Sequence, residues 1–290
     1  MKPIYPTPDK AGLTTSLTGL DAKGQAVTIP VVTERPLTIF LNRQEVVTAM
    51  TLGDQPEALA VGFLRNQNML TADDEITAID VDEELAVVVV RTERATNYED
   101  KLQKKIRTSG CAQGTLYGDI MDQFDQITLP EGPKVKASTL YQLSATINAI
   151  PSLYLKAGAI HGCALATDET PLLYLEDIGR HNAVDKIAGH MFLQDISGAD
   201  KIFYTTGRLT TEMVIKTVLM GIPILVSRSG FTEAGVSLAR QAGLTLVGRM
   251  RGARFTVLSG AERILFDDIR EEVQQEKSSA QSAQLGGRDR

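Results

Sequence analysis

Apolar segments in the first third of the chain predict a small β/α unit. Two runs rich in β-branched residues, 37–42 and 46–51, are separated by a short polar stretch, which is typical of a β-hairpin. An amphipathic segment at 57–66 follows a proline and predicts a helix. A further strand pair is expected at 76–81 and 85–90, and it completes the unit.

The second half of the chain alternates short apolar runs with amphipathic segments. This alternation predicts an α/β fold with a largely parallel sheet that helices cover on both faces. We expect helices at 138–150, 180–194, 211–220 and 232–242, and strands at 159–166, 172–177, 201–205, 223–227, 244–248 and 255–258.

The same pattern divides the chain into five parts. The first residues show no apolar period, and the last are charged and rich in Ser, Gln and Gly, so both ends are expected to lack fixed structure. The parts are a flexible N-terminal arm (1–26), a small β/α domain (27–105), a cysteine-bearing loop and connection (106–136), an α/β domain (137–268) and a disordered tail (269–290).

Composition narrows the class of protein. The 290 residues are 43% hydrophobic and 23% charged, and no apolar run is long enough to span a membrane. The N-terminus lacks a signal-peptide pattern, and two cysteines argue for a reducing compartment rather than a disulfide framework. The net charge of −6 argues against a nucleic-acid binder. We therefore expect a cytoplasmic globular protein that binds neither membrane nor nucleic acid.

Cys111 lies among Gly, Ser and Thr residues in the segment 106–115, downstream of several Lys and Arg residues. Cationic surroundings favour the thiolate, which is the nucleophilic form of cysteine. A free cysteine is more often a small, buried apolar residue, although the neighbours of Cys111 are polar. Cys111 is a candidate catalytic nucleophile, and from composition alone both interpretations stay open.

Two strand-to-helix connections in the second half, 206–211 and 227–232, share one design. Each places glycine, hydroxyl side chains and one arginine where a strand ends and a helix begins. Ligands bind at this edge of α/β sheets, and helix N-termini offer N–H groups to anions. Hydroxyl residues also cap helices without binding anything, so a phosphate-bearing ligand and a purely structural role are both open. The candidate ligand residues are Gly207, Arg208, Ser227, Ser229 and Gly230.

The most polar segment is 177–186. In a helix, His181 and Asp185 lie one turn apart, so they could pair and act as a general base or an orienting group. A polar helix start capped by Asp177 is the structural alternative. We assign Arg180, His181 and Asp185 supporting roles, in holding a site in shape or managing a proton.

The residues 161–163 invite comparison with a metal site. Zinc deaminases carry a His-x-Glu motif that is followed along the chain by Pro-Cys-x-x-Cys. Here Cys163 occupies the glutamate position, and the chain has no Cys-x-x-Cys pair. We therefore expect no zinc, and we interpret Cys163 as a packing residue.

Taken together, these segments resemble the FdhD family, the accessory sulfurtransferases of formate dehydrogenase. The resemblance spans residues 34–265. It rests on Asp-Ile-Gly-Arg-His-Asn-Ala-Val-Asp-Lys at 177–186, on Thr-Ser-Gly-Cys at 108–111 and on shorter matches elsewhere. It implies a second domain similar to the cytidine deaminase fold, without its zinc, and a homodimer.

The resemblance also implies an activity. The family takes sulfur as a persulfide from a cysteine desulfurase and passes it to a molybdenum or tungsten cofactor, molybdopterin guanine dinucleotide. The cofactor then enters the catalytic subunit of formate dehydrogenase, and GDP or a related nucleotide is expected to mimic it. The family's reactive loop is commonly Cys-x-x-Cys; here Cys111 is kept and Gly114 replaces the second cysteine. The family's C-terminal cofactor stretch corresponds to Phe255, Thr256, Val257, Leu258, Ser259 and Gly260.

Two other functions stay open at this point. A cofactor-binding chaperone without sulfur chemistry would use the same pocket, with Cys111 only as a contact. A cysteine hydrolase or acyltransferase would pair Cys111 with His181 and would need an oxyanion site, which the sequence does not reveal.

Overall fold

A computed structural model describes residues 2–71, 74–93, 105–107, 115–117, 120–121 and 124–267. The segment that contains Cys111 and Gly114 lies outside the described residues, and so does the predicted tail at 269–290. The predictions for these two segments therefore stay predictions.

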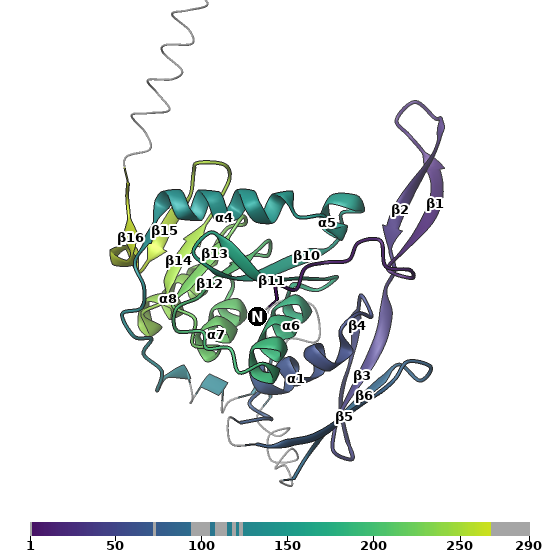
Figure 1. Cartoon of the computed structure of the whole chain (residues 1–290), viewed down its shortest axis with the longest axis horizontal. Helices are drawn as coiled ribbons and strands as arrows, with labels where there is room; N and C mark the ends of the chain where they lie inside the picture. Colours follow the sequence, from purple (N-terminus) through teal and green to yellow (C-terminus); the bar gives the residue numbers. More distant parts are fainter. Residues whose placement is uncertain are drawn as a thin grey trace, which may run out of the picture.

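The first unit is a four-stranded sheet covered by helix α1 (Figure 1). The predicted hairpin is confirmed: β3 pairs antiparallel with β4, and β5 pairs antiparallel with β6. Strands β3 and β6 are parallel neighbours in the middle of the sheet. Their alternate residues pack with α1 in one apolar core. The elements are β3 (Arg35–Leu41), β4 (Gln44–Thr51), α1 (Pro56–Asn66), β5 (Ile76–Asp82) and β6 (Val87–Thr92).

The residues ahead of this sheet hold defined structure, which corrects the prediction of a flexible arm over 1–26. Strands β1 (Thr14–Leu20) and β2 (Ala26–Val32) form an antiparallel hairpin that projects from the body of the molecule (Figure 1). Upstream of the hairpin, Ile4 forms a parallel bridge with Leu173 in the second sheet. Most hairpin residues are exposed, so the hairpin shows no apolar alternation from which it could be predicted.

The second unit is built on a six-stranded sheet in the order β11-β10-β12-β13-β14-β15. Within it, β12, β13 and β14 run parallel to one another, whereas β10 and β15 run antiparallel to their neighbours. The prediction of a largely parallel sheet is therefore wrong, because a tight hairpin joins β10 to β11 where a parallel pair would need a long crossover. The strands are β10 (His161–Thr167), β11 (Thr170–Asp177), β12 (Ile202–Thr205), β13 (Ile224–Ser227), β14 (Thr245–Gly248) and β15 (Thr256–Ser259).

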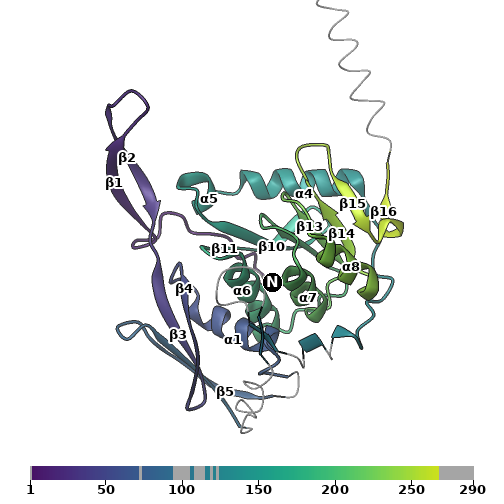
Figure 2. The ribbon, with the colours of Figure 1, turned by 180° about the vertical axis from the view of Figure 1, so that it is seen from behind.

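Helices cover both faces of this sheet, which gives three layers (Figures 1 and 2). One face packs against α4, and the other packs against α6, α7 and α8. Within β12, Tyr204 faces the first layer and Phe203 the second, as the two-residue period of a strand requires. The helices are α4 (Ala137–Ala149), α5 (Leu153–Lys156), α6 (Arg180–Leu193), α7 (Thr211–Leu219) and α8 (Glu233–Ala242). A mixed α/β fold is confirmed, and the likeness to cytidine deaminase stays a prediction.

Several short elements complete the described chain. Two small pairings lie outside the main sheets: β7 pairs with β8, and β9 pairs with β16. None of the helices in the described ranges combines the length and the apolar character that crossing a bilayer requires. The short elements are β7 (Lys105–Arg107), β8 (Thr115–Tyr117), β9 (Val135–Lys136), the 3-10 turn η1 (Ala261–Arg263) and β16 (Ile264–Leu265).

The two units meet where α1 packs across α6. Gly62 of α1 and Gly189 of α6 lie at the crossing, where each faces the backbone of the other helix. The polar segment 177–186 runs along this junction, so side chains from both units surround it.

Candidate functional site

A buried lysine joins the two units. Lys186 is fully buried, and its Nζ lies 2.6 Å from Asp177 Oδ2 and 2.5 Å from Asp54 Oδ1. It also donates a hydrogen bond of 2.9 Å to the carbonyl oxygen of Glu176. Burial alone would lower the pKa of Lys186, but the two carboxylates outweigh burial and raise it. Lys186 is therefore a charged, structural cation that ties α6 to the segment before α1.

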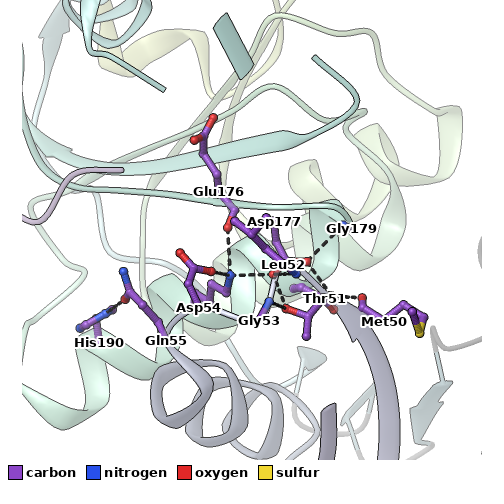
Figure 3. A network of polar contacts seen from close by, with 12 residues as sticks. Met50, Thr51, Leu52, Gly53, Asp54, Gln55, Glu176, Asp177, Gly179 and His190 are labelled. Atoms are coloured by element: carbon purple, nitrogen blue, oxygen red, sulfur yellow. Dashed lines mark hydrogen bonds and ion pairs between the residues drawn. The ribbon is translucent and has the colours of Figure 1, made fainter. Parts of the chain in front are cut away.

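Asp177 is the acceptor at the centre of this network (Figure 3). Thr51 Oγ1 donates to Asp177 Oδ2 at 2.6 Å, and Asn182 Nδ2 donates to Asp177 Oδ1 at 2.9 Å. Asn182 Nδ2 also lies 2.9 Å from the carbonyl oxygen of Met50. The N-cap position of α6 is Gly179, so the side chain of Asp177 holds the end of β4 against α6 rather than simply capping the helix.

A cavity of about 410 Å³ lies at this junction, within the size range of small-molecule sites. One wall is apolar and comes from the first unit. The other is polar and comes mostly from the segment that the sequence singled out, so the structure brings Arg180, His181 and Asp185 together. The apolar wall includes Ile39, Val47, Ala49, Met50, Leu59 and Phe63; the polar wall includes His161, Gly179, Arg180, His181, Asn182, Asp185, Glu212 and Lys216.

His181 and Asp185 do not pair with each other, which differs from the possibility raised by their spacing. His181 Nε2 lies 2.9 Å from Glu212 Oε2. Asp185 lies 2.7 and 2.8 Å from Lys216 Nζ, and Asn66 Nδ2 donates to it at 2.7 Å. The reason is the neighbouring helix α7, whose residues 212 and 216 offer opposite charges one turn apart. Each residue of α6 therefore pairs across to α7.

The histidines of the cavity are held in the neutral form. Burial lowers the pKa of His181, and the positive charges of Lys216 and Arg180 add to this effect, while Glu212 opposes it. Burial also lowers the pKa of His161, and Arg180, His181 and Arg208 contribute. The cavity therefore concentrates cationic groups next to two neutral imidazoles.

A second cavity, of about 310 Å³, lies at the carboxyl ends of the parallel strands. His161 lines both cavities, and its Nδ1 lies 3.4 Å from Thr206 Oγ1. Two arginines face this second space, and the Arg228 guanidinium lies 5.5 Å from the ring centroid of Tyr154. The lining residues are Tyr154, Ile160, His161, Thr206, Arg228, Ser229 and Arg251.

The two predicted anion-binding connections are bound to each other. Ser227 is fully buried, and its Oγ donates to the carbonyl oxygen of Gly207 at 2.6 Å and accepts from the Ser229 amide at 2.9 Å. The Leu209 amide donates to the carbonyl oxygen of Gly230. Ser227, Gly207 and Gly230 thus hold the connections in place. Of the five predicted ligand residues, Ser229 lines the cavity, and Arg208 is exposed near His161.

The predicted cofactor stretch 255–260 follows strand β15, so its two ends lie at opposite ends of the strands of the sheet. In the antiparallel pairing of β15 with β14, Thr256 lies opposite Gly248 and Ser259 lies opposite Leu246. The stretch therefore begins near the carboxyl ends of the parallel strands, where the second cavity lies, and finishes near their amino ends. There the carbonyl oxygen of Gly260 accepts from Thr245 Oγ1 at 2.8 Å. Contact between this whole stretch and one ligand stays a prediction.

Cys163 is fully buried in the sheet, which confirms it as a packing cysteine. Its Sγ donates to Thr205 Oγ1 at 3.3 Å, and burial raises the pKa of its thiol to about 12. In the part of the chain that the structure describes, no group of three or more His, Cys, Asp or Glu side chains is placed to hold a metal ion.

The chain is similar to known proteins over most of its length. The model of the FdhD/NarQ family matches residues 32–265. The "Sulfur carrier protein FdhD" of Bacillus subtilis (strain 168) is 31% identical over 234 residues, covering 80% of this chain and 89% of the relative. The protein of the same name from Listeria monocytogenes serotype 4b is 30% identical over 243 residues, covering 83% and 93%.

A crystal structure from Desulfotalea psychrophila, described as a formate dehydrogenase accessory protein, matches this fold. Its TM-score is 0.71 at 28% identity, and the match covers 87% of this chain and 98% of that one. The sequence and structure matches agree with each other and support a sulfur-carrier role. They agree with the family resemblance that the polar segment at 177–186 indicates. The chain belongs to the FdhD/NarQ family.

Proposed function

We propose that this chain accepts sulfur from the persulfide of a cysteine desulfurase on Cys111 and passes it to molybdopterin guanine dinucleotide. The cofactor is then inserted into formate dehydrogenase. The printed names of the relatives, a sulfur carrier and a formate dehydrogenase accessory protein, support the outline of this role. The two cavities around His161 support a ligand with both an apolar part and an anionic part.

The loading step is an exchange between two thiols. The Cys111 thiolate attacks the outer sulfur of the donor persulfide, a new S–S bond forms on Cys111, and the donor's S–S bond breaks. The desulfurase cysteine leaves as a thiolate, so no net oxidation or reduction occurs. The thiolate form of Cys111 is required for this attack.

One observation carries the assignment of the sulfur to Cys111: the chain has two cysteines, and Cys163 is fully buried with its pKa raised to about 12. A thiol in that state is neither accessible nor ionised at neutral pH. Because Gly114 stands where the family commonly has a second loop cysteine, Cys111 has no loop partner for a disulfide. Release of the sulfur as sulfide therefore takes two electrons from two external thiol groups, which are joined in a disulfide.

The residues that line the cavities fit the chemistry of the client. Arginine and hydroxyl groups such as Arg228, Arg251, Thr206 and Ser229 suit phosphate oxygens. The larger cavity offers an apolar wall against which a planar ring system can lie. Here His161 lies between the two environments. We infer that the phosphates of the cofactor occupy the smaller cavity.

Restoration of formate dehydrogenase activity tests the function. Cells that lack this protein are supplied with the wild type, with Cys111→Ala, or with Arg91→Gln as a surface control. We expect the wild type and Arg91→Gln to restore activity and Cys111→Ala to fail. Full activity with Cys111→Ala would reject sulfur transfer and favour a cofactor-binding chaperone. Gly114 in place of the family's second loop cysteine also fits that alternative function.

Nucleotide binding tests the cavity. Titration calorimetry with GDP should detect binding to the wild type. Arg251→Gln should weaken that binding about tenfold or more, because a charge-assisted hydrogen bond to phosphate is lost. The control Arg91→Gln should bind as the wild type does. Equal affinity in all three proteins would contradict the assignment of the phosphates to this cavity.

A further inference from the structure

We propose that His161 binds the anionic part of the ligand as an imidazolium, and that it takes up a proton from solvent when this ligand enters the smaller cavity. The inference deepens the proposed function and rests on its assignment of the phosphates to that cavity. It does not depend on the sulfur chemistry of Cys111. It gives a ligand-binding role to a residue whose sequence position suggested comparison only with a zinc site.

The position of His161 carries the argument. It is the first residue of β10, its side chain is partly buried, and it lines both cavities. The smaller cavity has a volume of about 310 Å³ and is also lined by Arg228 and Arg251. An anion bound in this space therefore lies close to the imidazole ring and to two guanidinium groups.

Thr206 holds the ring in a way that suits both of its charge states. His161 Nδ1 lies 3.4 Å from Thr206 Oγ1, which also accepts from the Gly162 amide at 3.0 Å. A hydroxyl has one hydrogen to donate and two lone pairs. It can therefore donate to Nδ1 of the neutral ring or accept from Nδ1–H of the imidazolium. Because Thr206 occupies Nδ1, we assign the ligand contact to Nε2.

Positive charges keep His161 neutral until an anion binds. Burial is the largest cause that lowers its pKa, and Arg180, His181 and Arg208 add to this effect. A bound anion offsets the charge of the arginines and accepts a hydrogen bond, and both changes favour the imidazolium. The two equilibria are linked: anion binding raises the pKa of His161, and protonation of His161 strengthens anion binding.

The carboxylates of the surrounding elements already have cationic partners. Asp177, which lies opposite His161 on β11, is paired with Lys186. Asp185 on α6 is paired with Lys216. The described residues that line the smaller cavity include no carboxylate, so the stabilising negative charge has to come from the ligand. The other charged or titratable residues that share a cavity with His161 are Glu34, Tyr154, Arg180, His181, Glu212, Lys216, Arg228 and Arg251.

Nuclear magnetic resonance on the wild type tests the proton uptake. The chain has three histidines, so the signals of ¹⁵N-histidine-labelled protein can be assigned with His181→Asn and His190→Gln. We expect the pKa of His161 to lie below 6.5 in the free protein and to rise by about one or more on saturation with GDP or with sulfate. Sulfate keeps both negative charges near neutral pH, so its own titration does not interfere. Sodium chloride at equal ionic strength is the control for screening.

His190 is the internal reference, because burial also lowers its pKa and it lines neither cavity. Its pKa should be the same with and without the anion. A His161 pKa that stays unchanged in protein saturated with GDP or sulfate would overturn the inference.

Calorimetry with GDP counts the protons. Titrations near pH 6.5 in two buffers of different ionisation enthalpy give the number of protons taken up on binding. The wild type should take up more protons than His161→Gln, by up to one, and His190→Gln should match the wild type. His161→Gln should also weaken GDP binding about tenfold near pH 6 and less near pH 8, because only the charged ring adds a charge-assisted hydrogen bond. Equal proton uptake by the wild type and His161→Gln would contradict the inference.

The same measurements separate this inference from the proposed function. Binding of GDP with no change in the His161 pKa would reject the inference and leave the phosphates in the smaller cavity. If neither GDP nor sulfate binds, the assignment of the phosphates fails and the inference fails with it. Failure of Cys111 to accept sulfur from a cysteine desulfurase would reject sulfur transfer, whereas a raised His161 pKa in the presence of GDP would still support the inference.

Discussion

A Cβ atom on Gly62 would lie 1.7 Å from the carbonyl oxygen of Asp185, so α1 and α6 touch backbone to backbone. The contact is reciprocal, because a Cβ atom on Gly189 would lie 1.9 Å from the carbonyl oxygen of Ala58. This close approach brings Asn66 of the first unit to the carboxylate of Asp185. The glycines therefore join the two units and set the distance between the two walls of the larger cavity.

Alanine at either crossing position should destabilise the protein. The added methyl group meets backbone atoms that cannot rotate away, so we expect Gly62→Ala and Gly189→Ala each to lower the free energy of unfolding by about 1–3 kcal/mol. Gly19→Ala is the control, since its Cβ would meet nothing within 4 Å. Urea unfolding measures all three, and equal losses at positions 19 and 62 would contradict the helix contact.

Removing the buried charge of Lys186 should be more costly than removing an exposed one. Lys186→Met leaves Asp54 and Asp177 without their cation in a buried site, and breaking such a pair costs about 3–5 kcal/mol. Arg91→Met breaks an ion pair whose side chains are 50% and 57% exposed, and the expected cost is about 0.2–1 kcal/mol. Chemical denaturation compares the two, and losses of similar size would show that the buried network contributes little.

The two cysteines should differ in reactivity. Cys163 is buried and its pKa is about 12, so it should resist alkylation in the folded protein at neutral pH. We expect iodoacetamide to modify one cysteine per chain in buffer and both in denaturant, and to modify none in folded Cys111→Ala. Rapid modification of folded Cys111→Ala would contradict the buried position of Cys163.

Stability should fall as the pH drops below about 6.5. The pKa values of His161, His181 and His190 are all lowered from 6.5, with burial as the largest cause. The unfolded chain then binds more protons than the folded one, so the free energy of unfolding decreases as pH falls from 6.5 through the folded pKa values. Glu176, whose pKa burial raises, acts in the opposite direction in more acidic solution.

Thermal unfolding as a function of pH measures this slope just below 6.5. His190→Gln removes one of the three histidines and should flatten the slope without reaching the cavity, because His190 does not line it. A slope that the variant leaves unchanged would assign the pH dependence to other groups.

Periodicity predicted most elements of the second unit because their apolar faces are buried. The helix at 180–194 and the strand at 201–205 are found as α6 and β12 within one residue at each end. Strand direction was not predictable in the same way, because an apolar strand has the same pattern in parallel and antiparallel pairs. The hairpin β1–β2 was missed because its residues are mostly exposed.

The sequence located the polar segment of the site but not its pairing. Residue spacing shows which groups share a helix face, and so it raised a pair between His181 and Asp185. The partners Glu212 and Lys216 come from another helix, and only tertiary packing brings them near. In the sequence, only the four-residue separation of Glu212 and Lys216 on α7 indicated that they could contact successive turns of a neighbouring helix. For Ser227 the sequence suggested a ligand contact that the structure does not support. Its residue type is typical of anion sites, but its side chain is buried and donates to the carbonyl oxygen of Gly207.

Intact-mass spectrometry after incubation with a cysteine desulfurase and cysteine, without reductant, tests the central claim most directly. The wild type should gain the mass of one sulfur atom, peptide mapping should place that atom on Cys111, and a thiol reductant should remove it. Cys111→Ala should gain nothing. Equal gain by Cys111→Ala would contradict the account, because Cys111 would then not be the residue that carries the sulfur.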